Sequence, residues 1–242
     1  MGAERVWEPR EYRSVHVLDK EINLWEVESS LGRCKDKQAA GEDGIPNEFY
    51  ENLPQNWKLF MVSLFNKIMK EECMPIKWSE VWVKMLYKKG QTRNPENYRP
   101  ISLVNSITKI FTQIIFTRLN NWCEHYNLLP VRAFPSVKHY LLWEKLERVG
   151  ISTKILKIFS GLYYNAEMRI KNSQGLSDPI RVTEGVLQGE VLSPLLFSLF
   201  IADLEDYLVR RGVRGVAISQ LVDLLILAYA DDIVIVTDST SG

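Results

Sequence analysis

The stretch Leu-Leu-Ile-Leu-Ala-Tyr-Ala-Asp-Asp-Ile-Val-Ile-Val, residues 224–236, places two adjacent carboxylates between two apolar runs. Both runs favour β-strand, so the sequence predicts a hairpin with Asp231 and Asp232 at its turn. Adjacent acids repel each other and are costly to desolvate without a counter-charge, which a bound divalent cation supplies. Because Asp is also a common turn residue, the pair alone leaves a plain hairpin turn open as an alternative.

Upstream of this stretch, Gly185-Val186-Leu187-Gln188-Gly189 precedes a segment predicted to form one long apolar helix over residues 194–210. Ser193 is expected to cap this helix, and Pro194 to take its first position. Glycines allow a backbone to approach a flat ligand such as a base pair, and Gln188 offers an amide beside them. An ordinary lead-in to a helix would explain the same residues.

A third candidate is a polar loop that begins with Lys88-Lys89-Gly90 and leads into Asn97-Tyr98-Arg99-Pro100-Ile101-Ser102-Leu103. Basic residues beside an aromatic ring suit contact with phosphates and bases. A solvated loop is the plain alternative.

The remaining segments predict an α+β fold, with helices packed on one side of a small antiparallel sheet. Ser136 and Ser152 are expected to cap the last two helices named here, and Gly150 to end the first of that pair. The expected helices are residues 53–73, 106–123, 137–149 and 153–164, and the expected strands are 81–87, 168–171 and 179–182.

Composition and charge limit the possible classes of protein. The 242 residues are 46% apolar with no net charge, which excludes a disordered or low-complexity chain. Residues 58–118 hold eleven basic and four acidic side chains, whereas residues 184–242 hold three basic and nine acidic ones. This segregation suits a protein that handles both a polyanion and metal ions. Three scattered cysteines, and no signal peptide or membrane span, predict an intracellular protein of the nucleus or cytoplasm.

Together and in this order, the motifs resemble the reverse transcriptase of LINE-type (non-LTR) retrotransposons over residues 39–237. The segment Ala39-Ala40-Gly41-Glu42-Asp43-Gly44-Ile45-Pro46 looks like the entry to the family's fingers, and residues 97–103 look like a fingers motif. Gln188-Gly189 with Leu192-Ser193-Pro194 looks like the motif that supports the nascent base pair. Tyr229-Ala230-Asp231-Asp232 matches the catalytic hairpin.

The sequence departs from the family where a third carboxylate is expected. Ala133-Phe134-Pro135-Ser136-Val137 matches the end of that motif, with Phe134 as the aromatic residue that screens out the ribose 2′-hydroxyl. Pro135 replaces one acid, and Leu129 stands where the metal-binding acid belongs. The segment expected between Pro130 and Ala133 is missing, and the family's thumb is expected beyond the catalytic hairpin, where this chain has only a few residues.

The resemblance implies an RNA-directed DNA polymerase with an N-terminal extension (1–38), a fingers-like region (39–130) and a partial palm (131–242). It implies an RNA template, a DNA primer, deoxynucleotides and two Mg²⁺ ions as partners. Because the third acid is missing, we expect a defective enzyme, with a non-catalytic nucleic-acid-binding remnant or a helical interaction remnant as alternatives. The implied site residues are Asp231 and Asp232 for catalysis and metal, Phe134, Gln188, Gly189 and Tyr229 for the nucleotide, and Lys88, Lys89 and Arg99 for nucleic acid.

Overall fold

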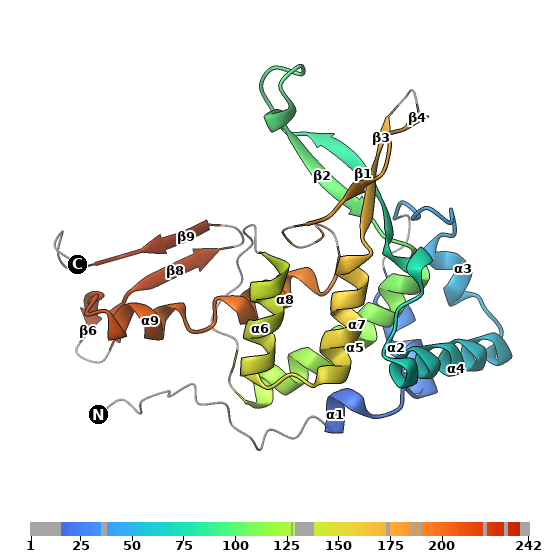
Figure 1. Ribbon diagram of the computed structural model, residues 1–242, viewed down its shortest axis with the longest axis horizontal. Coiled ribbons are helices and arrows are strands. Elements are labelled where there is room, and N and C mark those ends of the chain that lie inside the picture. The colour runs from blue at the N-terminus through green and yellow to red at the C-terminus, as the bar shows by residue number, and fades with distance from the viewer. Residues whose placement is uncertain are drawn as a thin grey trace.

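The computed structural model describes residues 16–34, 38–126, 128, 138–172, 175–183, 185, 187, 190–219, 222–229 and 232–237. Figure 1 shows a layer of packed helices, a sheet that projects away from it, and a separate hairpin formed by β8 and β9. The helices are α1 (His16–Asp19), α2 (Leu24–Leu31), α3 (Asn47–Glu51), α4 (Gln55–Glu71), α5 (Ser106–His125), α6 (His139–Val149), α7 (Thr153–Tyr164), α8 (Ser193–Phe200) and α9 (Leu204–Arg210). The four helices expected between residues 53 and 164 are therefore confirmed, with small shifts of their ends.

The main sheet joins segments that lie far apart in the sequence. Its strands are β1 (Glu80–Tyr87), β2 (Tyr98–Leu103), β3 (Glu167–Asn172), β4 (Gly175–Leu176) and β5 (Ile180–Arg181). The order is β2-β1-β3-β4, with β5 also paired to β3. Strands β1 and β3 run parallel, so the expectation of a purely antiparallel sheet was wrong. Such a pair needs a long crossover, which α5, α6 and α7 provide.

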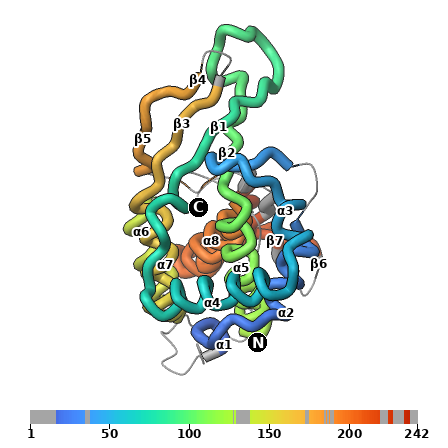
Figure 2. The backbone as a smooth tube through the Cα atoms, turned by 90° about the vertical axis from the view of Figure 1, so that its right-hand side faces the viewer, coloured from blue at the N-terminus to red at the C-terminus, as the bar shows by residue number. Residues whose placement is uncertain are grey.

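The sheet is buried at one end and exposed at the other. Val81 and Val83 near the start of β1 are buried, as is Ser102 near the end of β2, whereas the far ends of both strands are exposed. The turned view in Figure 2 shows the same strands rising beyond the helices. One end of the hairpin is therefore anchored in the core, while the other projects into solvent.

The core lies between the helices and the base of the sheet. Phe65 of α4 and Phe111 of α5 are fully buried, with ring centroids 5.4 Å apart, and Trp78 packs about 6.2 Å from each. Offset and edge-on rings of this kind add attraction beyond the area that they bury. Both ends of the α6–α7 turn follow the predictions: Gly150 ends α6 with a positive φ of 97°, and the Ser152 hydroxyl accepts from the Ile155 N–H at 3.2 Å. Ser136 lies outside the described residues.

A buried arginine fastens α1 and α2 to α5. Arg118 is 4% exposed and donates to both carboxylate oxygens of Glu26 at 2.6 and 2.8 Å. It also donates to the carbonyls of Leu18, Lys20 and Glu21. Burial raises the pKa of Glu26, but the hydrogen bonds and charge of Arg118 outweigh it, so the pKa lies below its ordinary value.

The helix expected over residues 194–210 is broken into α8 and α9, so that prediction was wrong. Helix α8 begins at Ser193, so Pro194 is its second residue and not the first as expected; α8 ends at Phe200 and α9 begins at Leu204. Asp203 pairs with Lys145 of α6 just before α9. With Glu205 and Asp206 in the first turn of α9, these acids favour a new helix start there.

The hairpin expected from residues 224–236 is present. Strands β8 (Ile226–Tyr229) and β9 (Asp232–Ile235) pair antiparallel, and Tyr229 is directly opposite Asp232. Asp232, which was expected in the turn, is instead the first residue of β9, because it pairs with Tyr229. A neighbouring hairpin, β6 (Val216–Ser219) with β7 (Val222–Leu224), was not expected. Within the described part of the chain, no helix has the length and apolar character needed to span a membrane.

Candidate nucleic-acid interface

The β1–β2 hairpin carries three of the residues expected to contact nucleic acid. In its register Arg99 is opposite Leu86 and Lys84 is opposite Ile101. Cross-strand partners project from the same side of a sheet, so Lys84 and Arg99 share one face. Both side chains are exposed, as are Lys88 and Lys89 at the end of the hairpin.

Strand β3 extends the same face with more positive charge. Its register places Arg169 beside Trp82 of β1, and Lys171 follows two residues later on the same side. The ammonium of Lys171 lies 4.1 Å from the centre of the Trp82 ring, which is cation–π contact and confirms that the two share a face. We call Lys84, Arg99, Arg169 and Lys171 the basic face.

Hydrogen bonds within the loop position Lys88 and Lys89. The N–H of Lys88 donates to the Asn97 carbonyl at 2.7 Å, which closes the hairpin. Gly90 has a φ of 95°, a conformation that other residues rarely adopt, and a Cβ there would lie 2.6 Å from the Asn97 side chain. On the opposite face of the sheet the rings of Tyr87 and Tyr98 pack 5.5 Å apart. The two lysines are therefore held on a structured loop.

Acidic side chains on this face gather at its base. Lys77 pairs with Glu80 at 3.5 Å. The carboxyl groups of Glu42 and Glu80 share a hydrogen bond, which raises the pKa of Glu42 and lowers that of Glu80. In the described part of the chain, Lys84, Lys88, Lys89 and Arg99 form no ion pair with a carboxylate. Their charges are therefore available to an external polyanion.

Most of the expected catalytic residues lie outside the described part of the chain. Those outside it are Phe134, Gln188, Gly189 and Asp231, and of Tyr229 and Asp232 only the backbone is described. The hairpin brings Tyr229 and Asp232 opposite each other.

The residues available for a metal do not complete the expected donor set. Among the described residues, no group of three or more His, Cys, Asp or Glu side chains is placed to hold an ion. Asp231 and Asp232 offer two carboxylates, but Leu129 and Pro135 occupy the sequence positions where further acids are expected, and neither side chain offers an oxygen. A two-metal site needs a shared bridging ligand, so we derive no catalytic step through Mg²⁺.

Glu190, between the glycine-containing segment and α8, was missed by the sequence reasoning. It is 3% exposed, and its Oε2 accepts from the N–H groups of Leu192 at 2.7 Å and Ser193 at 3.2 Å. It therefore takes the capping role that was expected of Ser193, whose hydroxyl instead donates to the Leu187 carbonyl. Burial raises the pKa of Glu190 to about 7, against the lowering effect of Thr112 and backbone N–H groups.

The cations of β3 were also missed, although a signal for them exists. Met168-Arg169-Ile170-Lys171 alternates apolar and basic residues, which predicts a strand with one basic side. That this side continues the face carrying Arg99 follows only from the parallel pairing of β1 with β3.

Comparison with known proteins agrees with the motifs. Residues 86–242 match the reverse transcriptase (RNA-dependent DNA polymerase) family. The chain is 27% identical to the "Probable RNA-directed DNA polymerase from transposon BS" of Drosophila melanogaster, over 91% of this chain and 28% of that protein. It is 28% identical to the "RNA-directed DNA polymerase from mobile element jockey" of Drosophila funebris, over 90% of this chain and 28% of that protein. It is 24% identical to the "Retrovirus-related Pol polyprotein from type-1 retrotransposable element R2" of Nasonia vitripennis, over 91% of this chain and 25% of that protein.

These alignments are longer than the part of this chain that they cover. For the transposon BS relative, 262 aligned positions cover 91% of 242 residues, which is about 220, so about 40 positions have no counterpart here. The alignments of 259 and 262 positions with the other two relatives leave a similar excess. This total is large enough to contain the segment expected between Pro130 and Ala133.

The matched region spans little more than a quarter of each of these relatives. It nevertheless includes the motifs in the expected order, and the family match covers well over half of the chain. By this match, and by its similarity to the polymerases of transposon BS, jockey and R2, the chain belongs to the reverse transcriptase family, among those of non-LTR retrotransposons.

Proposed function

We propose that this chain binds RNA through the basic face and the Lys88–Lys89 loop, and that it extends a primer weakly or not at all. The observation that carries the proposal is that Lys84, Lys88, Lys89 and Arg99 are exposed and form no ion pair with another described residue, on a hairpin whose base is fixed in the core. Phosphate contacts of this kind bind nucleic acid without reading its sequence.

The catalytic part of the proposal rests on the replaced acids. Asp231 and Asp232 have no third carboxylate in the sequence where the family motif requires it, because Leu129 and Pro135 stand there. Loss of a metal ligand removes several kcal/mol of transition-state stabilisation, about a thousandfold or more in rate. The family resemblance implies a DNA primer and deoxynucleotides as substrates, and this chain would use them poorly.

RNA binding is tested by the salt dependence of affinity. We expect the Kd of a short fluorescein-labelled RNA, measured by anisotropy, to rise steeply with salt. Each phosphate contact on single strands contributes about 0.7 to the log–log slope, so Lys88→Ala/Lys89→Ala/Arg99→Ala should flatten it by about 2.

The matched control removes three other positive charges from exposed helix positions, as Lys67→Ala/Lys70→Ala/Arg148→Ala. This control should retain most of the wild-type slope. A control that flattens the slope as much as the hairpin variant would show that only net charge matters. No salt-dependent binding by the wild-type chain would favour the helical interaction remnant.

Catalysis is tested by extension of a DNA primer annealed to an RNA template, with Mg²⁺ or Mn²⁺. We expect no template-dependent product from the wild-type chain, and none from Asp231→Ala. Template-dependent extension that disappears in Asp231→Ala would show that the wild-type chain has a competent catalytic site. It would overturn the proposal that the enzyme is defective.

A further inference from the structure

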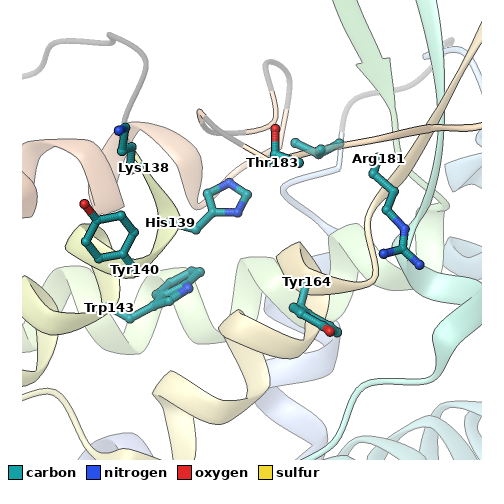
Figure 3. A pocket seen from close by; sticks show the side chains of 8 residues that line it. Lys138, His139, Tyr140, Trp143, Tyr164, Arg181 and Thr183 are labelled. Carbon is teal, nitrogen blue, oxygen red and sulfur yellow. The ribbon is translucent and has the colours of Figure 1, made fainter.

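A cavity of about 480 Å³ lies where the start of α6 meets the end of α7 and strand β5. This volume is within the range of small-ligand pockets, about 300–1,000 Å³. None of the described residues around it was assigned a role by the sequence motifs. Its described lining is Lys138, His139, Tyr140, Trp143, Tyr164, Arg181, Val182 and Thr183 (Figure 3).

One part of the lining is fixed in place. His139 and Trp143 pack against the fully buried ring of Tyr163, with centroids 5.3 and 5.6 Å away. The Nε2 of His139 lies 2.8 Å from the Gly185 carbonyl oxygen, which links α6 to the segment before α8. Trp143 therefore presents a positioned aromatic surface.

The other two rings are largely free. Tyr140 is 64% exposed and Tyr164 is 83% exposed, which is unusual for side chains that gain so much from burial. They come from different helices and lie at the same cavity as Trp143 (Figure 3). Exposed aromatic rings grouped around a cavity are typical of sites where nucleic-acid bases stack.

The charges around the cavity favour an anion. Lys138 and Arg181 lie on opposite sides of it (Figure 3), and both are exposed. The described lining contains no carboxylate. Helix α6 also begins here, with no acidic residue in its first turn, so the positive end of its dipole adds to the potential.

Arg181 connects the cavity to the basic face. In the sheet it pairs with Glu167 of β3, which places it on the same side as Arg169. A chain of phosphates lying along the basic face therefore meets Arg181 at the edge of the sheet and reaches the aromatic rings next.

We propose that this cavity holds one nucleotide unit of a single-stranded RNA, with its base against Tyr140, Trp143 or Tyr164 and its phosphate near Lys138 and Arg181. The proposal rests on the proposed RNA binding for the identity of the polymer. It goes beyond that proposal in assigning a stacking site to residues for which the family resemblance gave no role.

The test compares Tyr140→Ala/Tyr164→Ala with the wild-type chain by anisotropy of the labelled RNA. Both rings are exposed, so their removal should leave the fold intact, as circular dichroism would verify. We expect Kd to rise about tenfold, because stacking on aromatic side chains contributes strongly to single-strand binding. The salt slope should stay unchanged, since stacking releases no counterions.

The matched control is Trp57→Ala/Tyr207→Ala, which removes two exposed aromatic rings from α4 and α9. It should bind RNA like the wild type. Crosslinking with 5-iodouracil-substituted RNA, followed by peptide mapping, should label the peptides that contain Tyr140 or Tyr164. A Kd within twofold of wild type for Tyr140→Ala/Tyr164→Ala, or an equal loss in the control, would overturn the proposal.

Two further outcomes separate the possible explanations. AMP and unlabelled RNA can be compared as competitors at equal nucleotide concentration. If AMP displaces the labelled RNA as effectively as unlabelled RNA does, the cavity binds a free mononucleotide and the assignment to a polymer is wrong. If Lys88→Ala/Lys89→Ala/Arg99→Ala leaves the slope unchanged but the tyrosine variant still weakens binding, the proposed hairpin interface fails and the cavity stands. The reverse result leaves the hairpin interface standing and rejects the cavity.

Discussion

Among the described residues, Arg118 and Glu190 are buried charged side chains in two different regions, and their surroundings satisfy them to different degrees. At the α2–α5 junction Arg118 donates to a carboxylate and to three backbone carbonyls. Before α8, Oε2 of Glu190 accepts two N–H groups, but Oε1 has no hydrogen-bond partner among the described residues. A buried charge with full partners can remain ionised, whereas one with half its partners is pushed towards its neutral form.

The difference shows in the direction of the two carboxyl pKa shifts. The pKa of Glu26, which faces Arg118, lies below its ordinary value. The ion pair therefore stabilises the fold above the ordinary pKa, and this stabilisation is lost as pH falls through the lowered pKa. Glu190 titrates above its ordinary range, at about 7, with the Tyr163 hydroxyl and Thr112 as its polar neighbours and no cation among the causes of its shift. Its neutral form stabilises the fold, and this contribution is lost as pH rises from about 4.5 to about 7.

The largest expected effect is that of Arg118→Ala. Removing the guanidinium leaves Glu26 and several carbonyls without their partner, so we expect the free energy of unfolding at pH 7 to fall by about 3–5 kcal/mol. Urea denaturation followed by circular dichroism measures this. Arg148→Ala is the control, because Arg148 is 71% exposed and its pair with Glu144 contributes at most about 0.5 kcal/mol. Equal losses in the two variants would contradict the contrast between buried and exposed pairs.

Glu190→Gln tests the other region and should act in the opposite direction. The amide oxygen can still accept from Leu192 and Ser193, but it carries no charge at high pH. We expect the variant to be more stable than the wild type at pH 8, by about 1–3 kcal/mol, with a difference that shrinks as pH falls from about 7 to about 4.5. Urea titrations across this range give the difference curve. A difference that does not change with pH would show that Glu190 titrates normally.

Ser152→Ala should have the smallest effect. Ser152 is an uncharged cap: its hydroxyl accepts from the Ile155 N–H and also lies 2.5 Å from Asp19 of α1. Loss of such a cap costs about 1 kcal/mol. Between pH 5 and 7, where the effect of Glu190→Gln changes most, we expect the cost of Ser152→Ala measured by urea denaturation to be constant. A cost above that of Arg118→Ala would mean that the contact with α1 outweighs the buried ion pair.

Local patterns predicted the local structure well. Helices α4 to α7 follow from apolar residues three and four apart, and the β8–β9 hairpin follows from the two strand-forming runs on either side of Ala230-Asp231-Asp232. The split between α8 and α9 was missed because Ile201 and Ala202 continue the apolar run of α8, while Asp203 pairs with Lys145 of α6, a contact that local sequence does not indicate.

Contacts between distant segments could not be predicted from those patterns. Nothing near Arg118 in the sequence indicates that its partners lie about 90 to 100 residues earlier. Of the candidate site, Lys88, Lys89 and Arg99 are exposed and their contact with nucleic acid stays a prediction, whereas Arg169 and Lys171 join them only through the parallel pairing. The roles of Asp231, Asp232, Gln188, Gly189, Phe134 and Tyr229 stay predictions.

The parallel pairing of β1 with β3 also has a consequence for the order of folding. Strand β2 follows β1 after a short loop, so this hairpin can form early, on the microsecond scale. Glu80 and Glu167, which face each other across β1 and β3, are 87 residues apart, so closing that contact carries a larger loop entropy. During synthesis the β1 edge therefore stays unpaired until α5, α6 and α7 have been made. Over that interval it offers free N–H and C=O groups to any other extended chain, which makes β1 the segment most open to misassembly before the fold is complete.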